Sequence, residues 1–206
     1  AEGYARSGDK RREASTLSNA GFALLRMGRT GEALQRFEAA IQLARQVGSA
    51  NTIAIATGNR GTLRRMLRDF RHAEEDLRSA SEEAKRLRHG PLIADTSVEL
   101  RYLALASDAP KERFLALDAN ATTASSSELS AALRVRARLG LSVTELEALA
   151  RKEELNTHSL DAEVELRVAL YEACGKTPEL LAAAQQAFTR YVTTMADGED
   201  AQTCAR

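Results

Sequence analysis

Two stretches of sequence decide the fold of this chain: ASTLSNAGFALLRMGRTGEALQRFEAA at residues 14–40 and AIATGNRGTLRRMLRDFRHAEEDLRSA at residues 54–80. The second stretch repeats the first with a shift of 40 residues. Small residues recur as small and large apolar residues as large in the pairs Gly21 and Gly61, Ala33 and Ala73, Phe37 and Leu77, and Ala40 and Ala80. Internal repetition at this length is typical of a stacked array of helical hairpins.

Each copy is predicted to form two helices joined by a short turn. In the first copy, apolar and small residues from Leu17 to Met27 keep the spacing of one helical face, and the pattern stops at residues 28–30. Thr30 is the predicted N-cap of a second helix over residues 31–47. Helices joined by so short a turn lie antiparallel, and small residues mark where their backbones approach most closely. Because a lone hairpin cannot bury both of its apolar faces, each hairpin is expected to stack on the next.

The small and large positions of both copies resemble the pattern of the tetratricopeptide repeat. The resemblance is carried by Leu17, Gly21, Leu24, Gly28, Ala33, Phe37 and Ala40 in the first copy, and by Gly61, Phe70, Ala73, Leu77 and Ala80 in the second. Arg64 departs from it, because it occupies the position of Leu24. The long period is similar to that of kinesin light chains and of many bacterial signalling and regulatory proteins. The resemblance implies an all-α, right-handed superhelical stack of antiparallel helix hairpins that serves protein–protein interaction.

The rest of the chain is expected to continue as helical hairpins. Residues 1–120 are predicted to contain two clear repeats and a degenerate third, and residues 121–206 to contain degenerate hairpins that continue the array. The last hairpin is predicted from residues 160–173 and a helix that begins at Pro178. The tail after Met195 is expected to fray. Because the first residues resemble the end of a repeat, the chain is expected to be a segment of a longer protein.

Composition agrees with an all-helical interaction module. The chain has 29 basic and 29 acidic residues, so its bulk charge favours neither nucleic acid nor an acidic membrane. Trp is absent and there are only 3 Pro, as is common in helical chains. Cys174 and Cys204 form neither a ligand cluster nor a disulfide framework, so a cytoplasmic location is expected. No stretch is long and apolar enough to span a membrane.

Candidate catalytic and metal-binding residues are few. His72, His89 and His158 lie far apart and have no neighbouring ligands at metal-site spacing, so no metal or other cofactor is expected. The segment from Gly58 to Gly61 resembles a phosphate-binding loop only in its glycines, because it lacks a lysine and lies inside a predicted helix. Paired acidic residues have basic neighbours at helical spacing, which is typical of a solvated face. The sequence therefore predicts that the protein is not an enzyme.

Arginine is dense in the second copy, and this density raises nucleic acid as an alternative partner. The arginines concerned are Arg60, Arg64, Arg65, Arg68, Arg71 and Arg78. Acidic residues are interleaved with them, and Phe70 is the only aromatic residue nearby, which is poor provision for base stacking. Nucleic acid is therefore not the expected partner.

A hairpin array offers an inner surface formed by its first helices. Asn19 stands two residues before Gly21, and Asn59 stands two residues before Gly61. In the tetratricopeptide repeat family an Asn at this position often binds a peptide backbone, a task that suits an amide because it both donates and accepts hydrogen bonds. Glu99 stands at the equivalent position of the third repeat and departs from the pattern. The predicted peptide-binding residues are Asn19, Phe22, Arg26, Asn59, Thr62, Arg65 and Tyr102.

The sequence therefore predicts a non-catalytic interaction or regulatory segment of a larger signalling protein that binds an extended peptide. The partner is another protein or a different domain of the same parent chain, and Arg26 and Arg65 favour an acidic or phosphorylated segment. The alternative is a sensor or autoinhibitory module of a bacterial kinase or transcriptional regulator. Such a module would respond to a small ligand or to a peptide.

Overall fold

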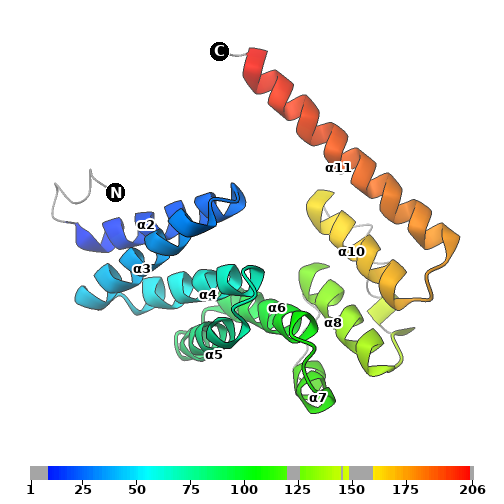
Figure 1. Ribbon diagram of the computed structural model, residues 1–206, viewed down its shortest axis with the longest axis horizontal. Helices are drawn as coiled ribbons and strands as arrows, with labels where there is room; N and C mark the ends of the chain where they lie inside the picture. Colours follow the sequence, from blue (N-terminus) through cyan, green and yellow to red (C-terminus); the bar gives the residue numbers. More distant parts are fainter. Residues whose placement is uncertain (1–8, 120–125, 145, 149–159, 205–206) are drawn as a thin grey trace. The chain divides into compact units, whose positions relative to one another are not determined.

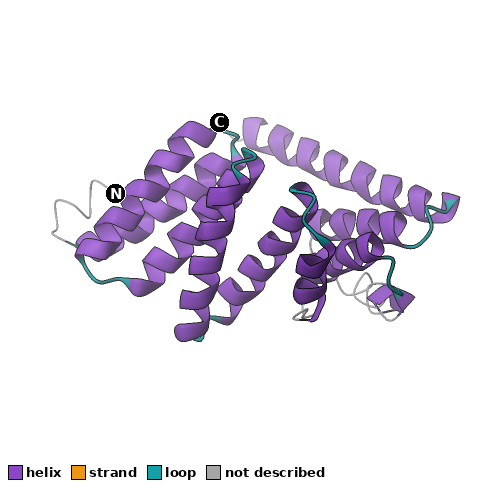
Figure 2. Cartoon of the chain, turned by 60° about the horizontal axis from the view of Figure 1, so that its bottom comes forward, coloured by secondary structure: helices purple, strands orange, loops and turns teal. Residues whose placement is uncertain are grey.

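The computed structural model describes residues 9–119, 126–144, 146–148 and 160–204, and every regular element within these ranges is a helix (Figure 2). The all-α fold predicted from the sequence is confirmed. The chain divides into two compact units, Ala1–Asp108 and Ala109–Arg206. Each unit has its own set of helices and its own core.

Five helices of equal length make up the described part of the first unit (Figure 1). They are α2 (Lys10–Arg26), α3 (Thr30–Gln46), α4 (Ala50–Met66), α5 (Phe70–Arg86) and α6 (Gly90–Ala106), each of 17 residues. Turns of three residues join them, so that a helix with its turn takes 20 residues and a hairpin takes the 40-residue period. The pairs α2/α3 and α4/α5 form hairpins, and contacts of α3 with α4 and of α5 with α6 stack these layers. The hairpin array predicted for this region is confirmed.

The turns of the first unit share one backbone conformation. The middle residue of each turn has a positive φ, which is 73° at Gly28, 63° at Gly48, 64° at Arg68 and 54° at Arg88. The N–H of the next residue then donates to a carbonyl five residues earlier, as His89 does to Ala84 at 2.9 Å. This is the bonding of a Schellman motif, in which the residue with positive φ favours glycine. Two of the four turns therefore carry an arginine where a glycine would be less strained.

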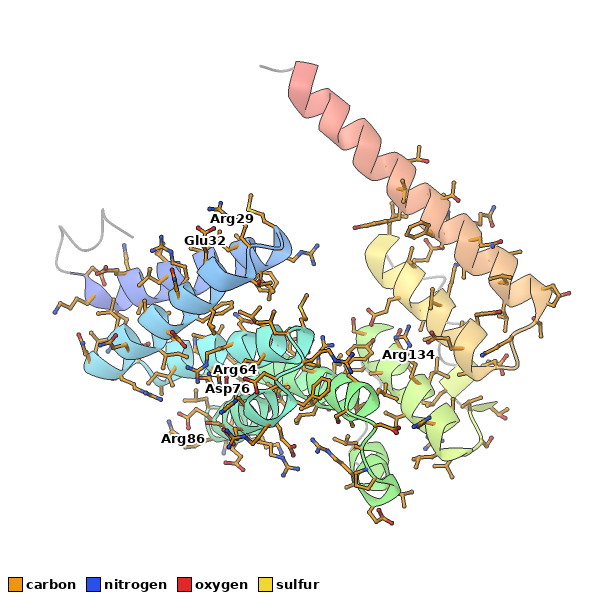
Figure 3. All side chains as sticks on the ribbon, in the orientation of Figure 1. Arg29, Glu32, Arg64, Asp76, Arg86 and Arg134 are labelled. Atoms are coloured by element: carbon orange, nitrogen blue, oxygen red, sulfur yellow. The ribbon has the colours of Figure 1, made fainter. Side chains whose placement is uncertain are left out.

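Helix α3 begins one residue earlier than predicted. Its N-cap is Arg29, which makes no side-chain capping bond, and Thr30 is the first helical residue. The Arg29 guanidinium instead forms an ion pair with Glu32 at 2.6 Å, which Figure 3 shows at the start of the helix. Because the preceding turn has a fixed length, the turn rather than the better capping side chain decides where the helix starts.

Glycines and alanines bring the two helices of each hairpin together, as the sequence predicts. A Cβ atom at Gly21 would lie 2.7 Å from the ring of Phe37, and a Cβ atom at Gly61 would lie 2.8 Å from Cγ of Leu77. Both distances are below any that a real Cβ atom shows without displacement of its neighbour. In each hairpin, a large apolar side chain of the second helix therefore packs directly on a glycine of the first helix.

The second unit contains a smaller set of helices in its described residues. They are α7 (Lys111–Ala119), α8 (Ser126–Leu139), α10 (Leu160–Ala173) and α11 (Pro178–Cys204). Helix α8 contacts α7 and α10, and α10 contacts α11 (Figure 1). The core joins the buried residues Leu129, Ala132, Leu133, Leu146, Leu166, Ala169, Leu170 and Leu180. The hairpin predicted from residues 160–173 and Pro178 is observed as α10 and α11.

The prediction that the tail frays after Met195 is wrong for the backbone. Helix α11 continues through Cys204 and is 27 residues long. Ala, Glu, Gln and Met supply half of its last ten residues, which contain no proline, and these residue types favour helix. Whether the second unit is a continuation of the same array stays a prediction.

Candidate interaction surface

One stripe of each first helix lies outside the core of the first unit. On α4, buried residues occupy several sides of the helix, whereas Ile55, Asn59, Thr62 and Met66 are half-buried or exposed. Helix α4 contacts both α2 and α6, so the three stripes are neighbours. Together they form a surface that we call the first-helix face, which consists of Ser15, Asn19, Phe22, Arg26, Ile55, Asn59, Thr62, Met66, Asp95, Glu99, Tyr102 and Ala106.

Asn19 and Asn59 occupy equivalent places on this face. Asn19 is exposed and Asn59 is half-buried. Among the residues that the structure describes, neither side-chain amide has a hydrogen-bonding partner in the protein. An accessible amide that the fold does not use is available to a ligand, and here two such amides lie on neighbouring parallel layers.

The third member of this row, Glu99, has a different role from the two asparagines. Its carboxylate accepts a hydrogen bond from Nε of Arg65 at 2.7 Å, which joins α6 to α4. The Arg65 guanidinium also lies over the ring of Tyr102, with 5.7 Å between Cζ and the ring centroid. About a fifth of each charged side chain is exposed, 21% for Arg65 and 20% for Glu99. The predicted ligand residue Arg65 is thus already paired, and it orients Tyr102.

The remaining predicted residues give the face a mixed character. Phe22 is 48% exposed, whereas Thr62 and Tyr102 are half-buried. The Thr62 hydroxyl donates to the carbonyl of Gly58 at 3.3 Å. Arg26 is exposed and has no acidic partner within the described part of the chain. It is therefore the cation on this face that is open to a ligand.

Large apolar side chains gather at the C-terminal ends of α2 and α4. Met27 is 70% exposed, Met66 54% and Leu67 50%. Phe22 lies one turn before the end of α2, and beneath this region Leu25 and Leu63 belong to one buried cluster. The two helix ends therefore lie together, and we call Phe22, Met27, Met66 and Leu67 the apolar edge.

The arginine-rich second copy is largely neutralised by its own hairpin. Asp76 on α5 is only 5% exposed. It accepts two hydrogen bonds from Arg60, at 2.7 and 2.8 Å, and one from Arg64 at 2.8 Å. Figure 3 shows Arg64 and Asp76 close together. The bonds that Arg60 donates to Asp76, together with the negative charges of Asp76 and Glu38, raise the pKa of Arg60 above its usual value.

Other arginines of this stretch also have partners. Arg78 bonds to Glu74 at 2.8 Å, and Arg71 lies 3.8 Å from Glu75. Arg68 lies over the ring of Phe70, with 5.4 Å from Cζ to the centroid. Charges committed in this way offer little to a phosphate backbone, which must be met by several unpaired cations.

Both histidines in the described residues make local contacts near the start of a helix. The His72 ring bonds to Asp69 at 2.8 Å, which lowers the pKa of this carboxyl, and His89 accepts from the N–H of Leu92 as a helix N-cap. His158 lies outside the described residues. No three His, Cys, Asp or Glu side chains in the described ranges meet in a way that could hold a metal ion.

In the same ranges, no helix combines the length and apolar character needed to cross a bilayer.

Two features of the site escaped sequence reasoning. The sequence marks Arg64 as a departure from an apolar position, but its partner Asp76 belongs, with Glu74 and Glu75, to the paired acidic residues that the sequence assigns to a solvated face. The 40-residue register of the repeat could have identified the pair of Arg64 and Asp76. It places Asp76 directly before Leu77, the residue that covers Gly61. Glu99 was recognised as a break in the asparagine row, and its partner Arg65 becomes apparent only when α4 and α6 are adjacent.

The comparison with known families agrees with this geometry. Residues 12–85 match the model of the tetratricopeptide repeat family, and this range runs from α2 to α5. These two hairpins are thus tetratricopeptide repeats, which supports a protein–protein interaction module. No curated protein and no solved structure gives a significant match.

Proposed function

We propose that the tetratricopeptide repeats of residues 12–85 make this chain a non-catalytic interaction or regulatory segment of a larger signalling protein, which binds an extended peptide on the first-helix face. The observation that carries this proposal is the pair of amides of Asn19 and Asn59, which are accessible and unused by the fold. An amide pairs with a peptide unit whatever side chain that unit bears. Two amides on successive layers suit a chain that crosses both α2 and α4.

Side chains of the peptide would be selected by the surroundings of these amides. The apolar edge favours large apolar residues, and Met27 and Met66 adapt to different shapes because methionine is flexible. Arg26 favours a carboxylate or phosphate nearby. Arg65 supports binding indirectly, because its bond to Glu99 and its contact with Tyr102 hold that ring in place.

The partner under this proposal is a protein segment, either from another cytoplasmic protein or from a different domain of the same parent. Nucleic acid is disfavoured, because Arg60 and Arg64 are engaged by Asp76 and Arg65 by Glu99. The role under this proposal is that of a scaffold or regulator, which the match to the tetratricopeptide repeat family supports.

The proposal is tested with peptides selected from a random displayed library against the full chain. Their affinities are then measured by calorimetry for the parent and for the double variant Asn19→Ala/Asn59→Ala. Each lost amide bond should weaken binding by about 0.5 to 1.5 kcal/mol, so the double variant should bind several different peptides about 5- to 150-fold more weakly. Arg26→Ala should weaken acidic peptides selectively.

A matched control is the double variant Gln35→Ala/Gln42→Ala, which removes two exposed amides from α3, outside the first-helix face. It should bind every selected peptide as the parent does. If the asparagine variant also binds all of them with parental affinity, the first-helix face is not the peptide site.

A further inference from the structure

The three stripes of the first-helix face differ in charge. The stripe on α2 ends in Arg26, an exposed cation with no acidic partner in the described part of the chain. The stripe on α6 carries two carboxylates, Asp95 and Glu99, and no cation. The stripe on α4, which lies between them, has no charged residue. The face is therefore cationic at its α2 end and acidic at its α6 end.

Glu99 is paired with Arg65, yet its carboxylate can still bind a ligand. Nε of Arg65 donates to Oε2 of Glu99 at 2.7 Å. The other oxygen, Oε1, has no partner among the residues that the structure describes, and the side chain is partly exposed. A carboxylate only accepts hydrogen bonds, whereas the amides of the two preceding layers both donate and accept. A ligand group at Glu99 must therefore be a donor, such as a lysine or arginine side chain or a backbone N–H.

An anionic group of a ligand is poorly accommodated at the α6 end. To reach Arg65 it would have to displace Glu99 or lie beside the negative charge of Glu99, and like charges at close range repel each other. The contact of Arg65 with the ring of Tyr102 further restricts how the guanidinium can turn toward a second acid. At Arg26 the same anionic group meets a cation that no acid of the described chain has neutralised. The two ends of the face therefore select opposite charges.

The positions of Arg26 and Glu99 set the spacing of these charges in the ligand. Helix α4 contacts both α2 and α6. Once the two 40-residue periods are subtracted, Arg26 stands seven residues further along its helix than Glu99. With about 8 to 10 Å between packed helices and about 1.5 Å of rise per residue, the two positions lie about 21 Å apart. An extended peptide spans this distance with about six residues, at about 3.3 Å each.

We propose that the segment bound on the first-helix face is charge-polar, with an acidic or phosphorylated residue at Arg26 and a lysine or arginine about six residues away at Glu99. This inference rests on the proposed function and adds the charge pattern of the partner. Glu99, which breaks the asparagine row, thereby becomes the residue that determines specificity in the third layer. Segments with two acidic positions or two basic positions at this spacing place one like charge against the face.

The first test uses peptides selected from a random displayed library against the full chain, with affinities measured by calorimetry. The selected sequences should share one acidic and one basic residue about six positions apart. Replacing the basic residue by glutamate removes one attraction and adds one repulsion, so it should weaken binding about 2- to 30-fold, as should replacing the acidic residue by lysine. Both losses should shrink in about 1 M salt, which screens exposed charges.

The second test assigns the selectivity to Glu99. Glu99→Gln keeps an acceptor for Arg65 and removes the negative charge, so it should bind the peptide with two acidic residues at least about twofold more tightly than the parent does. A purely structural role for Glu99 predicts no such gain. Arg26→Glu should likewise bind the peptide with two lysines more tightly. The matched control is Glu38→Gln, which removes an exposed carboxylate from α3 and should leave all three affinities unchanged.

The outcomes separate this inference from the proposed function. Equal affinity for the mixed-charge peptide and the peptide with two acidic residues overturns the charge pattern, as does Glu99→Gln without a gain. If Asn19→Ala/Asn59→Ala weakens the selected peptides while the charge exchanges have no effect, the peptide site stands and the charge pattern alone is wrong. If the asparagine variant keeps the parental affinity for every peptide, the peptide site is wrong and the charge pattern falls with it.

Discussion

The hairpins α2/α3 and α4/α5 have similar backbones, but side chains of different chemistry join the two helices of each hairpin. Both have helices of 17 residues, and both seat a large apolar side chain on a glycine. In the first hairpin the position of Arg64 is filled by Leu24, which packs beside the cluster of Leu25, Phe37 and Leu63. In the second hairpin, Arg64 and its neighbour Arg60 bond instead to the buried Asp76.

This difference shows which contacts the repeat requires and which it leaves open. Glycine and alanine recur at the closest approaches, because only a small side chain fits there. At the position of Leu24 in the first hairpin and Arg64 in the second, the contact between the two helices is apolar in one case and ionic in the other. A buried ionic contact is costly to desolvate, so it contributes little net stability while it is complete, yet the hairpin depends strongly on every member of it.

The largest effect on stability is therefore expected from breaking the ion pairs of Asp76 with Arg60 and Arg64. Asp76→Ala leaves Arg60 and Arg64 half-buried without their shared carboxylate, and should lower the free energy of unfolding by about 3 kcal/mol. Urea denaturation followed by circular dichroism measures this change. Glu74→Ala is the matched control, because its pair with Arg78 lies at the surface, and it should cost less than about 1 kcal/mol.

A sharper experiment replaces all three charged residues of this contact. The triple variant Arg60→Ala/Arg64→Leu/Asp76→Leu gives the second hairpin an apolar contact between its two helices, as the first hairpin has. Its stability should lie within about 1 kcal/mol of the parent or above it, because no charge is left buried alone. A triple variant as unstable as Asp76→Ala would show that the carboxylate stabilises the hairpin by itself.

An intermediate effect of the same size in both hairpins is expected at the shared alanines. Ala33→Leu and Ala73→Leu insert a large side chain where both residues are fully buried, and each should destabilise the protein by about 1 to 3 kcal/mol through overpacking. Thermal melts of the two variants test the repeat register directly. Unchanged melting temperatures in both would contradict the equivalence of the two hairpins.

The smallest effect is expected at the turns, where the first hairpin has glycine and the second has arginine. Arg88→Gly relieves a positive φ of 54° and should raise the free energy of unfolding by up to about 1 kcal/mol. Gly48→Ala should lower it by a similar amount, because Gly48 has a φ of 63°. The comparison is made by chemical denaturation, and a loss of stability in Arg88→Gly would mean that the arginine side chain contributes more than the strain costs.

The features predictable from sequence were those set by local periodicity. The stripes of small and large residues located the helices and their antiparallel pairing, with small residues where the helices approach most closely. That Phe37 lies on Gly21 and Leu77 on Gly61 is a finding of the structure. All seven proposed ligand residues lie at least partly exposed on α2, α4 and α6. Their role in binding stays a prediction.

The partners of charged side chains were not predictable in this way. Arg65 lies 34 residues from Glu99 along the chain, and the density of arginine in a sequence does not reveal which acid each one meets. The N-cap of α3 was displaced by one residue, because a turn of fixed length outweighed the intrinsic preference of Thr30. Such features depend on neighbouring layers and turns, which a local pattern does not specify.

The contacts of the first unit also shape how it folds. Among α2 to α6, the helices that the structure describes in this unit, each contacts the next helix or the next but one, as α2 does with α3 and α4. Contacts between segments so close in sequence are rapid to form, because little chain entropy is lost in closing the loops between them. A hairpin at either end can then detach while its neighbours stay folded, so that the unit opens from its ends in steps rather than all at once.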